Sequence, residues 1–267
     1  MRILFATDGS RGASLAEDFL LALPLSRADE VVVLNVPVGN ERESYALLSR
    51  CRWRFAARDI LTTTVIRAGH PAEVVETVAF EYQSELIVVG SRGFGTITGA
   101  LMGSVARALT RNAPAPVLVV RAHRNAPRRV LLAVDGSADA RAAVELVARL
   151  PLPRESRITV LQLGDPADPQ TQWVQRHARA LLGERVIGED AVLGGPVGEH
   201  VLRRATLSGS DVIVLGARDQ TVGVGLLGTS LADHVTSHAC CAVLIAKPSL
   251  ARRNAESSVA SKAVPAI

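Results

Sequence analysis

The stretch "GSRGFGTITGALMGS" (residues 90–104) contains five glycines and continues directly from the apolar run "ELIVVG" (residues 85–90). Four consecutive apolar residues without polar alternation are typical of a parallel strand that helices cover on both faces. After the glycines, the sequence from Ser104 to Arg111 has a helical pattern. We therefore expect a buried strand, a glycine-rich loop at its carboxyl end and then a helix, which is the unit of an open α/β sheet.

The same arrangement recurs in the second half of the chain, in "VLGARDQTVGVGLLGTS" (residues 214–230). Other blocks recur in the same order: "RILFATDGS" at residue 2 returns as "RVLLAVDGS" at residue 129, and "PVLVVRA" at residue 116 returns as "AVLIAKP" at residue 242. The offsets of 126 or 127 residues correspond to a whole domain rather than to a solenoid repeat. We expect two copies of one domain, at 1–122 and 129–248, joined by a linker at 123–128. The segment 249–267 lacks periodicity and is rich in Ala, Ser and charge, so we expect a disordered tail.

Short apolar runs alternate with helical patterns in both copies, which predicts right-handed, doubly wound parallel sheets. The strands expected in the first copy are 3–7, 31–36, 62–67, 86–90 and 117–121, with helices at 13–23, 41–58, 71–82 and 104–111. The strands expected in the second copy are 130–134, 158–163, 189–193, 212–216 and 243–246.

The composition indicates what kind of core, which partners and which cellular compartment to expect. Hydrophobic residues make up 48% of the 267 residues and aromatic residues 3%, which suits a core of Val, Leu, Ala and Ile. The 30 Lys and Arg residues against 26 Asp and Glu form no basic stripe with interleaved aromatics, so no nucleic acid is expected as a partner. No window approaches the roughly 18–20 apolar residues of a membrane span, and Asp8 interrupts the first apolar run, so we expect neither a membrane partner nor a signal peptide. Three cysteines, two of them adjacent, make a poor disulfide framework, which indicates a reduced, cytoplasmic protein.

The glycine-rich loop favours a phosphate ligand. Ligands of open α/β sheets bind beyond the carboxyl ends of the strands, where the strand order reverses. Glycines there permit positive φ and a close approach of the backbone, because no Cβ atom is in the way. The N–H groups at the start of the next helix, with Ser104 among them, favour an anion, and Arg92 adds a charge-assisted contact. The loop is neither a Walker A motif nor Gly-x-Gly-x-x-Gly, so it predicts a phosphate loop of another kind.

The spacing Gly90, two residues, Gly93, nine residues, Gly103, Ser104 resembles the ATP-binding motif of the universal stress protein family. "ATDGS" (6–10), "AGHPAEVV" (68–75) and "APAPVLVVR" (113–121) are similar to other elements of that family, and the resemblance covers nearly the whole chain apart from the tail. It implies an α/β fold of two flavodoxin-like (HUP or Rossmann-like), doubly wound, five-stranded parallel-sheet domains in tandem. It also implies that paired domains join through their last strands.

The resemblance further implies ATP, with or without Mg²⁺, as the ligand of the first copy. With Arg92 added from the loop, the ATP-binding residues it implies are Ala6, Thr7, Asp8, Val36, Val89, Gly90, Arg92, Gly93, Gly103, Ser104 and Val105. A carboxylate such as Asp8, at the carboxyl end of a strand, can accept a hydrogen bond from the adenine amino group or from the ribose hydroxyls. The alternative for Asp8 is a structural role in an Asx turn or a helix cap.

The second copy departs from this motif. Gly216 and Gly228–Thr229 remain, but Asp219 stands where the middle glycine is expected, and eight residues rather than nine follow it. A carboxylate at that point repels a polyphosphate, and a shorter loop cannot present the same N–H groups. Asp135 retains the aspartate of the adenosine side. We expect that the second copy does not bind ATP in the way that the first copy does. We expect it to act instead as a structural partner or a regulatory surface.

Three functions remain open on the sequence. The first is a nucleotide-sensing regulator of the stress response, as a homodimer that engages an unknown protein partner. The second is a slow ATPase or a nucleotide-dependent transferase, although Asp8 and Ser104 are the only evident groups near the loop. The third is a scaffold that uses no nucleotide. No Ser/His/Asp, Cys/His or metal-ligand set can be assigned from spacing, so no catalytic or metal-binding residue is expected.

Overall fold

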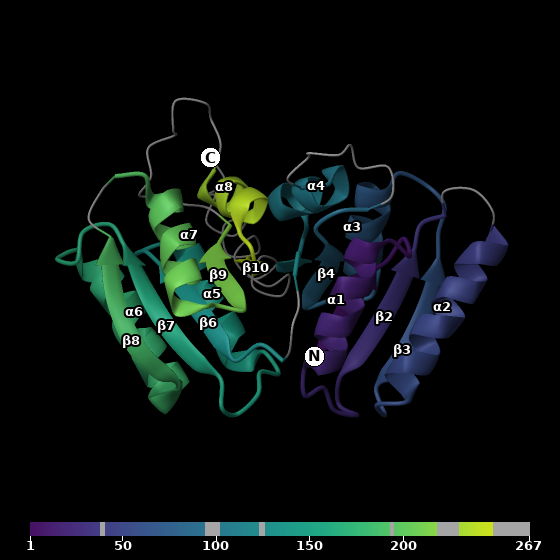
Figure 1. The fold of residues 1–267 in the computed structure, drawn as a ribbon, viewed down its shortest axis with the longest axis horizontal. Helices are drawn as coiled ribbons and strands as arrows, with labels where there is room; N and C mark the ends of the chain where they lie inside the picture. Colours follow the sequence, from purple (N-terminus) through teal and green to yellow (C-terminus); the bar gives the residue numbers. More distant parts are fainter. Residues whose placement is uncertain (38–40, 94–101, 123–125, 193–194, 218–229, 248–267) are drawn as a thin grey trace, which may run out of the picture.

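The computed structural model describes residues 1–37, 41–93, 102–122, 126–192, 195–217 and 230–247 (Figure 1). The elements of the first half are β1 (Arg2–Ala6), α1 (Arg11–Ala22), β2 (Glu30–Asn35), α2 (Glu41–Ala56), β3 (Leu61–Ile66), α3 (Pro71–Glu81), β4 (Leu86–Gly90), α4 (Ser104–Asn112) and β5 (Val117–Val120). The elements of the second half are β6 (Arg129–Val134), α5 (Ala138–Arg149), β7 (Arg157–Leu163), α6 (Pro169–Leu182), the short 3₁₀ helix η1 (Gly183–Arg185), β8 (Val186–Val192), α7 (Val197–Ser208), β9 (Val212–Gly216), α8 (Leu231–His238) and β10 (Ala242–Ala246).

The ten strands of the described residues form one sheet in the order β3-β2-β1-β4-β5-β10-β9-β6-β7-β8. Every pair of neighbours is parallel except β5 and β10, which run antiparallel with Val243 opposite Val119. The pairing of the two last strands, expected above, is therefore confirmed within one chain. In the first half the strand order reverses between β1 and β4, so the carboxyl ends of these two strands flank the switch point. The expected α/β fold class is confirmed.

Most predicted strands agree with the structure, but the third strand of the second half begins at Val186 rather than at residue 189. A β-bulge explains the difference. Ile158 pairs with Val186, the next residue of β7 pairs with Gly188, and Ile187 lies between them with 60% of its surface exposed. The bulge and the glycine obscure the alternation by which a strand is recognised in sequence. The disordered tail predicted at 249–267 and part of the predicted linker lie outside the described residues.

Helices cover both faces of the sheet. On one face α1, α2, α5 and α6 enclose a single apolar core that runs through both halves, with Phe5, Leu20 and Leu132 among its fully buried residues. On the other face α3 and α4 cover the first half and α7 and α8 the second, each pair with its own core. Strands buried on both faces explain the apolar runs without alternation. Within the described ranges, no helix is long and apolar enough to cross a membrane.

The two halves exchange charged contacts around β5 and β10. Arg111 of α4 binds the Asp233 carboxylate of α8 through two nitrogens, the shorter contact being 2.7 Å. Arg121, directly after β5, donates to two carbonyls near the end of α8, at 2.9 and 3.1 Å. Lys247, directly after β10, donates to two carbonyls at the end of α4, at 3.0 and 3.2 Å. Each half thus places a cation at the negative end of the other half's last helix, and Figure 1 shows α4 and α8 side by side.

Candidate functional site

A cavity of about 500 Å³ opens at the carboxyl ends of β1, β2 and β4, beside the switch point. All eleven residues that the sequence predicted for ATP line it. These are Ala6, Thr7, Asp8, Val36, Val89, Gly90, Arg92, Gly93, Gly103, Ser104 and Val105. The structure therefore brings together residues that lie up to 99 positions apart in the chain.

The turn after β1 is fixed by a network of short contacts. The side chain of Asn35, at the end of β2, donates to the carbonyl of Thr7 at 2.7 Å. Asp8 Oδ1 accepts the N–H of Ser10 at 2.9 Å, which makes an Asx turn. Ser10 then caps α1, because its Oγ accepts the N–H of Ala13 at 3.2 Å. The structural role considered for Asp8 is thus present, and the same side chain lines the cavity.

The loop glycines that the structure describes, Gly90, Gly93 and Gly103, provide space rather than unusual backbone angles. None of Gly90, Gly93 and Gly103 has positive φ, contrary to one reason given above for placing glycine here. A Cβ on Gly90 would lie 2.7 Å from the backbone nitrogen of Ala13, so this glycine lets α1 pack directly on the end of β4. A Cβ on Gly93 would overlap Oδ2 of Asp8. A side chain at position 93 would therefore displace the Asp8 carboxylate from its place beside the loop.

The helix that begins at the cavity has no side-chain cap. Gly103 is the N-cap residue of α4, and its N–H donates to the carbonyl of Ser91 at 2.8 Å. The corresponding N-cap of α8 is Ser230, whose hydroxyl accepts the N–H of Asp233 at 3.1 Å. The first-turn N–H groups of α4 therefore face the cavity without a capping hydroxyl, and they attract an anion.

The charges in the cavity are of both signs. Arg92 lies at the end formed by β4 and α4, and Glu43 lies on the first turn of α2, near the end of β2. Burial lowers the pKa of Arg121, at the end of the neighbouring β5, and the positive charge of Arg92 lowers that pKa further. Arg92 and Arg121 therefore place two positive charges near the end of the cavity beside β4. Within the described ranges, no group of three or more His, Cys, Asp or Glu side chains is placed to hold a metal ion.

The sequence prediction missed ten residues of the lining. Three of them, Glu43, Ser44 and Leu47, come from α2, which no motif pointed to. The topology was the available signal, because the helix that follows β2 must begin at the same edge of the sheet. The other missed residues are Gly9, Ala13, Leu34, Asn35, Pro71, Val75 and Ala106.

In the second half, the turn after β6 is closely packed. Asp135 repeats the Asx turn by accepting the N–H of Ser137 at 2.9 Å, but it is only 5% exposed. A Cβ on Gly136 would lie 2.9 Å from the Cβ of Gln170 and 3.2 Å from the backbone nitrogen of Thr171. The first turn of α6 therefore packs on the turn after β6. Asp219 and the rest of the altered glycine loop lie outside the described residues.

Comparisons with known proteins agree with this geometry. The model described as "Universal stress protein family" matches residues 1–121. A universal stress protein of Synechocystis is 31% identical over 131 residues, which are 44% of this chain and 83% of that protein. The chain belongs to the universal stress protein family.

The likeness to universal stress proteins extends into the second half of the chain. A universal stress protein of Mycobacterium tuberculosis is 26% identical over 224 residues, 73% of this chain and 75% of that protein, a span longer than either half. The crystal structure of a universal stress protein from Archaeoglobus fulgidus aligns with a TM-score of 0.71, covering 92% of this chain and 96% of that one. At 18% identity, that structure supports the fold alone.

Proposed function

We propose that this universal stress protein is a nucleotide-sensing regulator that holds ATP in the cavity of its first half. The observation that carries the proposal is the convergence of all eleven predicted residues on one cavity at the switch point of the sheet. A volume of about 500 Å³ lies within the range of small-molecule and cofactor sites.

The distribution of polar and apolar groups supports one orientation of the ligand. Val36 and Leu47 line the end beside β2 and offer an apolar wall to the adenine ring. Arg92 and the N-terminus of α4 form the opposite end, where negative charge is favoured. Asp8 lies in the turn after β1, the strand between β2 and β4, where it can accept hydrogen bonds from the nucleoside. ATP has the same polarity, with an apolar base at one end and phosphates at the other.

The contacts of α4 give the regulatory part of the proposal a physical route. Its first turn lies at the phosphate end of the cavity, and its last turn accepts hydrogen bonds from Lys247 of the second half. A phosphate bound to the first turn of α4 would therefore contact a helix whose other end binds Lys247 of the second half. Such a ligand shifts the conformational population only if it binds one form of the protein more tightly than another.

The two halves have different roles in this proposal. We assign residues 1–122 to an ATP-binding universal stress protein domain and 129–248 to a second domain that supports it without binding ATP in the same way. The packing of α6 on Gly136 and the capping of α8 by Ser230 support this assignment. Both contacts use groups that would otherwise be available to a ligand.

The proposal is tested by denaturing the purified full chain and counting the nucleotide molecules released per chain. We expect about one ATP per chain, with the nucleotide lost in Gly103→Val and retained in Ser230→Val, the corresponding N-cap of the second half. Circular dichroism checks that both variants fold. If no nucleotide is released and none is taken up from added ATP, the proposal is wrong and the scaffold alternative is favoured. Equal loss in both variants would contradict the assignment of the site to the first half.

A further inference from the structure

Glu43 is the charged side chain at the end of the candidate ATP cavity beside β2, among the lining residues that the structure describes. The other charged residues of that lining are Asp8, in the turn after β1, and Arg92, at the end beside β4. Within the described ranges, the carboxylate of Glu43 makes no ion pair and no hydrogen bond with the rest of the protein. Its side chain is exposed at the cavity and is therefore available to a ligand.

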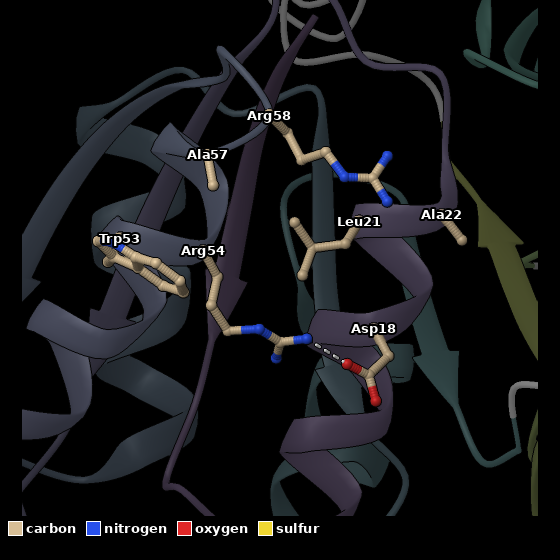
Figure 2. Close-up of a pocket in the computed structure, with 7 residues that line it drawn as sticks. All are labelled: Asp18, Leu21, Ala22, Trp53, Arg54, Ala57 and Arg58. Atoms are coloured by element: carbon tan, nitrogen blue, oxygen red, sulfur yellow. Dashed lines mark hydrogen bonds and ion pairs between the residues drawn. The ribbon is translucent and has the colours of Figure 1, made fainter.

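The packing of α2 fixes the position of Glu43. Figure 2 shows Arg54, on the last turn of α2, extended to Asp18 of α1, and the two charged groups lie 2.6 Å apart. The next residue, Phe55, is fully buried, and its ring meets that of Phe5 of β1 edge-on with the centroids 6.3 Å apart. The helix is thus held both to α1 and to the sheet. Its first turn lies at the carboxyl edge of the sheet, because α2 follows β2.

Glu43 and Leu47 lie on one face of α2. They are four residues apart, which is about one helical turn, and both line the cavity. Since α2 runs from the carboxyl edge of the sheet toward the amino edge, Glu43 is nearer the opening and Leu47 lies deeper. Glu43 is exposed and Leu47 is half-buried, in agreement with this order. A base whose ring lies against Leu47 can therefore direct its polar edge toward Glu43.

The two carboxylates of the lining suit different parts of a nucleotide. Oδ2 of Asp8 lies beside Gly93, whose added Cβ would overlap it, so Asp8 is close to the loop proposed for the phosphates and suits the ribose. Glu43 lies at the other end, where the base is proposed. An ionised carboxylate only accepts hydrogen bonds, and the 6-amino group is the donor that adenine carries on its edges.

A second acceptor at the same end of the cavity favours the same kind of ligand. Asn35, at the end of β2, lines the cavity and is 5% exposed. Its Nδ2 donates to the carbonyl of Thr7, but its Oδ1 has no hydrogen-bond partner among the residues that the structure describes. A buried acceptor without a partner is destabilising, and a ligand that donates to it removes that cost. The end of the cavity beside β2 therefore favours a ligand with hydrogen-bond donors.

We propose that Glu43 is a specificity-determining residue, which accepts a hydrogen bond from the 6-amino group of adenine and selects 6-aminopurine over 6-oxopurine nucleotides. The inference rests on the proposed function, because it assumes a purine nucleotide in the cavity. A 6-oxopurine has a carbonyl oxygen in place of the amino group, and two acceptors that face each other form no hydrogen bond. Glutamine at position 43 removes the discrimination, because its amide can donate to the carbonyl or accept from the amino group.

The experiment is isothermal titration calorimetry of the full chain with ATP and with inosine triphosphate (ITP), a 6-oxopurine nucleotide. Both nucleotides carry the same ribose and phosphates, so the ratio of their dissociation constants reports on the base alone. We expect ATP to bind about tenfold more tightly than ITP or better, and Glu43→Gln to reduce the preference to about threefold or less.

Glu41→Gln is the matched control for Glu43→Gln. Glu41 lies in the same first turn of α2 but outside the lining of the cavity. Its substitution removes the same charge from the same end of the helix, so it accounts for effects on α2 and on the general attraction of a polyanion. We expect Glu41→Gln to keep the preference for ATP. Both side chains are exposed, and circular dichroism checks that the variants fold.

The outcomes distinguish the role of Glu43 from the proposed function. If the original chain binds neither nucleotide, the proposed function is wrong and this inference is wrong with it. If ATP binds but ITP binds as tightly, or if Glu43→Gln keeps the preference, only the role of Glu43 is refuted. Titration with 2′-deoxy-ATP tests the other contact open to a carboxylate. If Glu43→Gln weakens ATP but not 2′-deoxy-ATP, Glu43 binds the ribose and the inference is overturned.

Discussion

Replacing Gly93 by Asp would give the first half the residue that the second half has at this point of the motif. The structure predicts two effects. A Cβ at position 93 overlaps Oδ2 of Asp8, so the side chain of Asp8 must move from its place in the cavity. The new carboxylate also lies at the end of the cavity where Arg92 and the N-terminus of α4 would hold phosphates.

The electrostatic part of this effect can be bounded. Two unit charges about 4 Å apart repel by about 1 kcal/mol in bulk water and by about 4 kcal/mol at the effective dielectric constant of a protein surface. Position 93 is exposed, so we take the lower half of that range. A loss of about 1.4 kcal/mol corresponds to a tenfold weaker affinity, and a polyphosphate carries several charges. We therefore expect Gly93→Asp to weaken ATP binding at least tenfold beyond the steric effect.

Gly93→Asn is the matched control, because it has the same shape without the charge. Isothermal titration calorimetry of ATP and of adenosine with both variants separates the two effects. The steric part should weaken both ligands in both variants, and the charge should weaken ATP alone in Gly93→Asp. Equal ATP affinities for the two variants would refute the electrostatic reasoning. An affinity of Gly93→Asp within twofold of the original protein would refute the placement of the phosphates.

Three further predictions follow from contacts outside the glycine loop. Ser10→Ala and Ser137→Ala each remove an N-cap, so each should lower the free energy of unfolding in urea by about 1 kcal/mol. Only Ser10→Ala should also weaken ATP binding, because the Ser10 hydroxyl donates to the carbonyl of Arg92 in the loop. Lys247 is 4% exposed and donates to two carbonyls at the end of α4, so Lys247→Met should lower the free energy of unfolding by about 1–3 kcal/mol. A change below about 0.5 kcal/mol would contradict the contribution of this contact. Burial raises the pKa of the Cys51 thiol to about 12, so Ellman's reagent at pH 8 should modify the exposed Cys240 at once and Cys51 only after unfolding. Rapid modification of Cys51 in the native protein would contradict its burial.

Where local motif and topology coincide, the sequence predicted which residues lie together. Parallel strands bring Asp8, Val36 and Gly90 to one edge of the sheet whatever the details of packing, and all three line the cavity. The contribution of α2 was missed because its placement depends on how the helix lies against α1, and no local pattern encodes that. The role of Gly90 was predicted only in part, because the atoms that leave no room for a Cβ there are the backbone of Gly12 and Ala13, on a helix early in the chain. The start of β8 was misplaced for a similar reason, since a bulge is a property of two paired strands.

Under the proposed function, the uncapped start of α4 gives a reason why a first half that binds ATP would benefit from a second half that does not. A nine-residue helix is marginal by itself, and a glycine N-cap in place of a capping hydroxyl costs roughly a few tenths of a kcal/mol. That cost cannot be removed at the N-terminus without occupying the N–H groups that a phosphate needs. The second half offsets it at the other end, where Lys247 donates to the last carbonyls and Asp233 binds Arg111. The second half caps its own helix with Ser230, which fits the proposal that it holds no phosphate there. On this view the loss of the motif in the second copy is the condition under which it can stabilise the first.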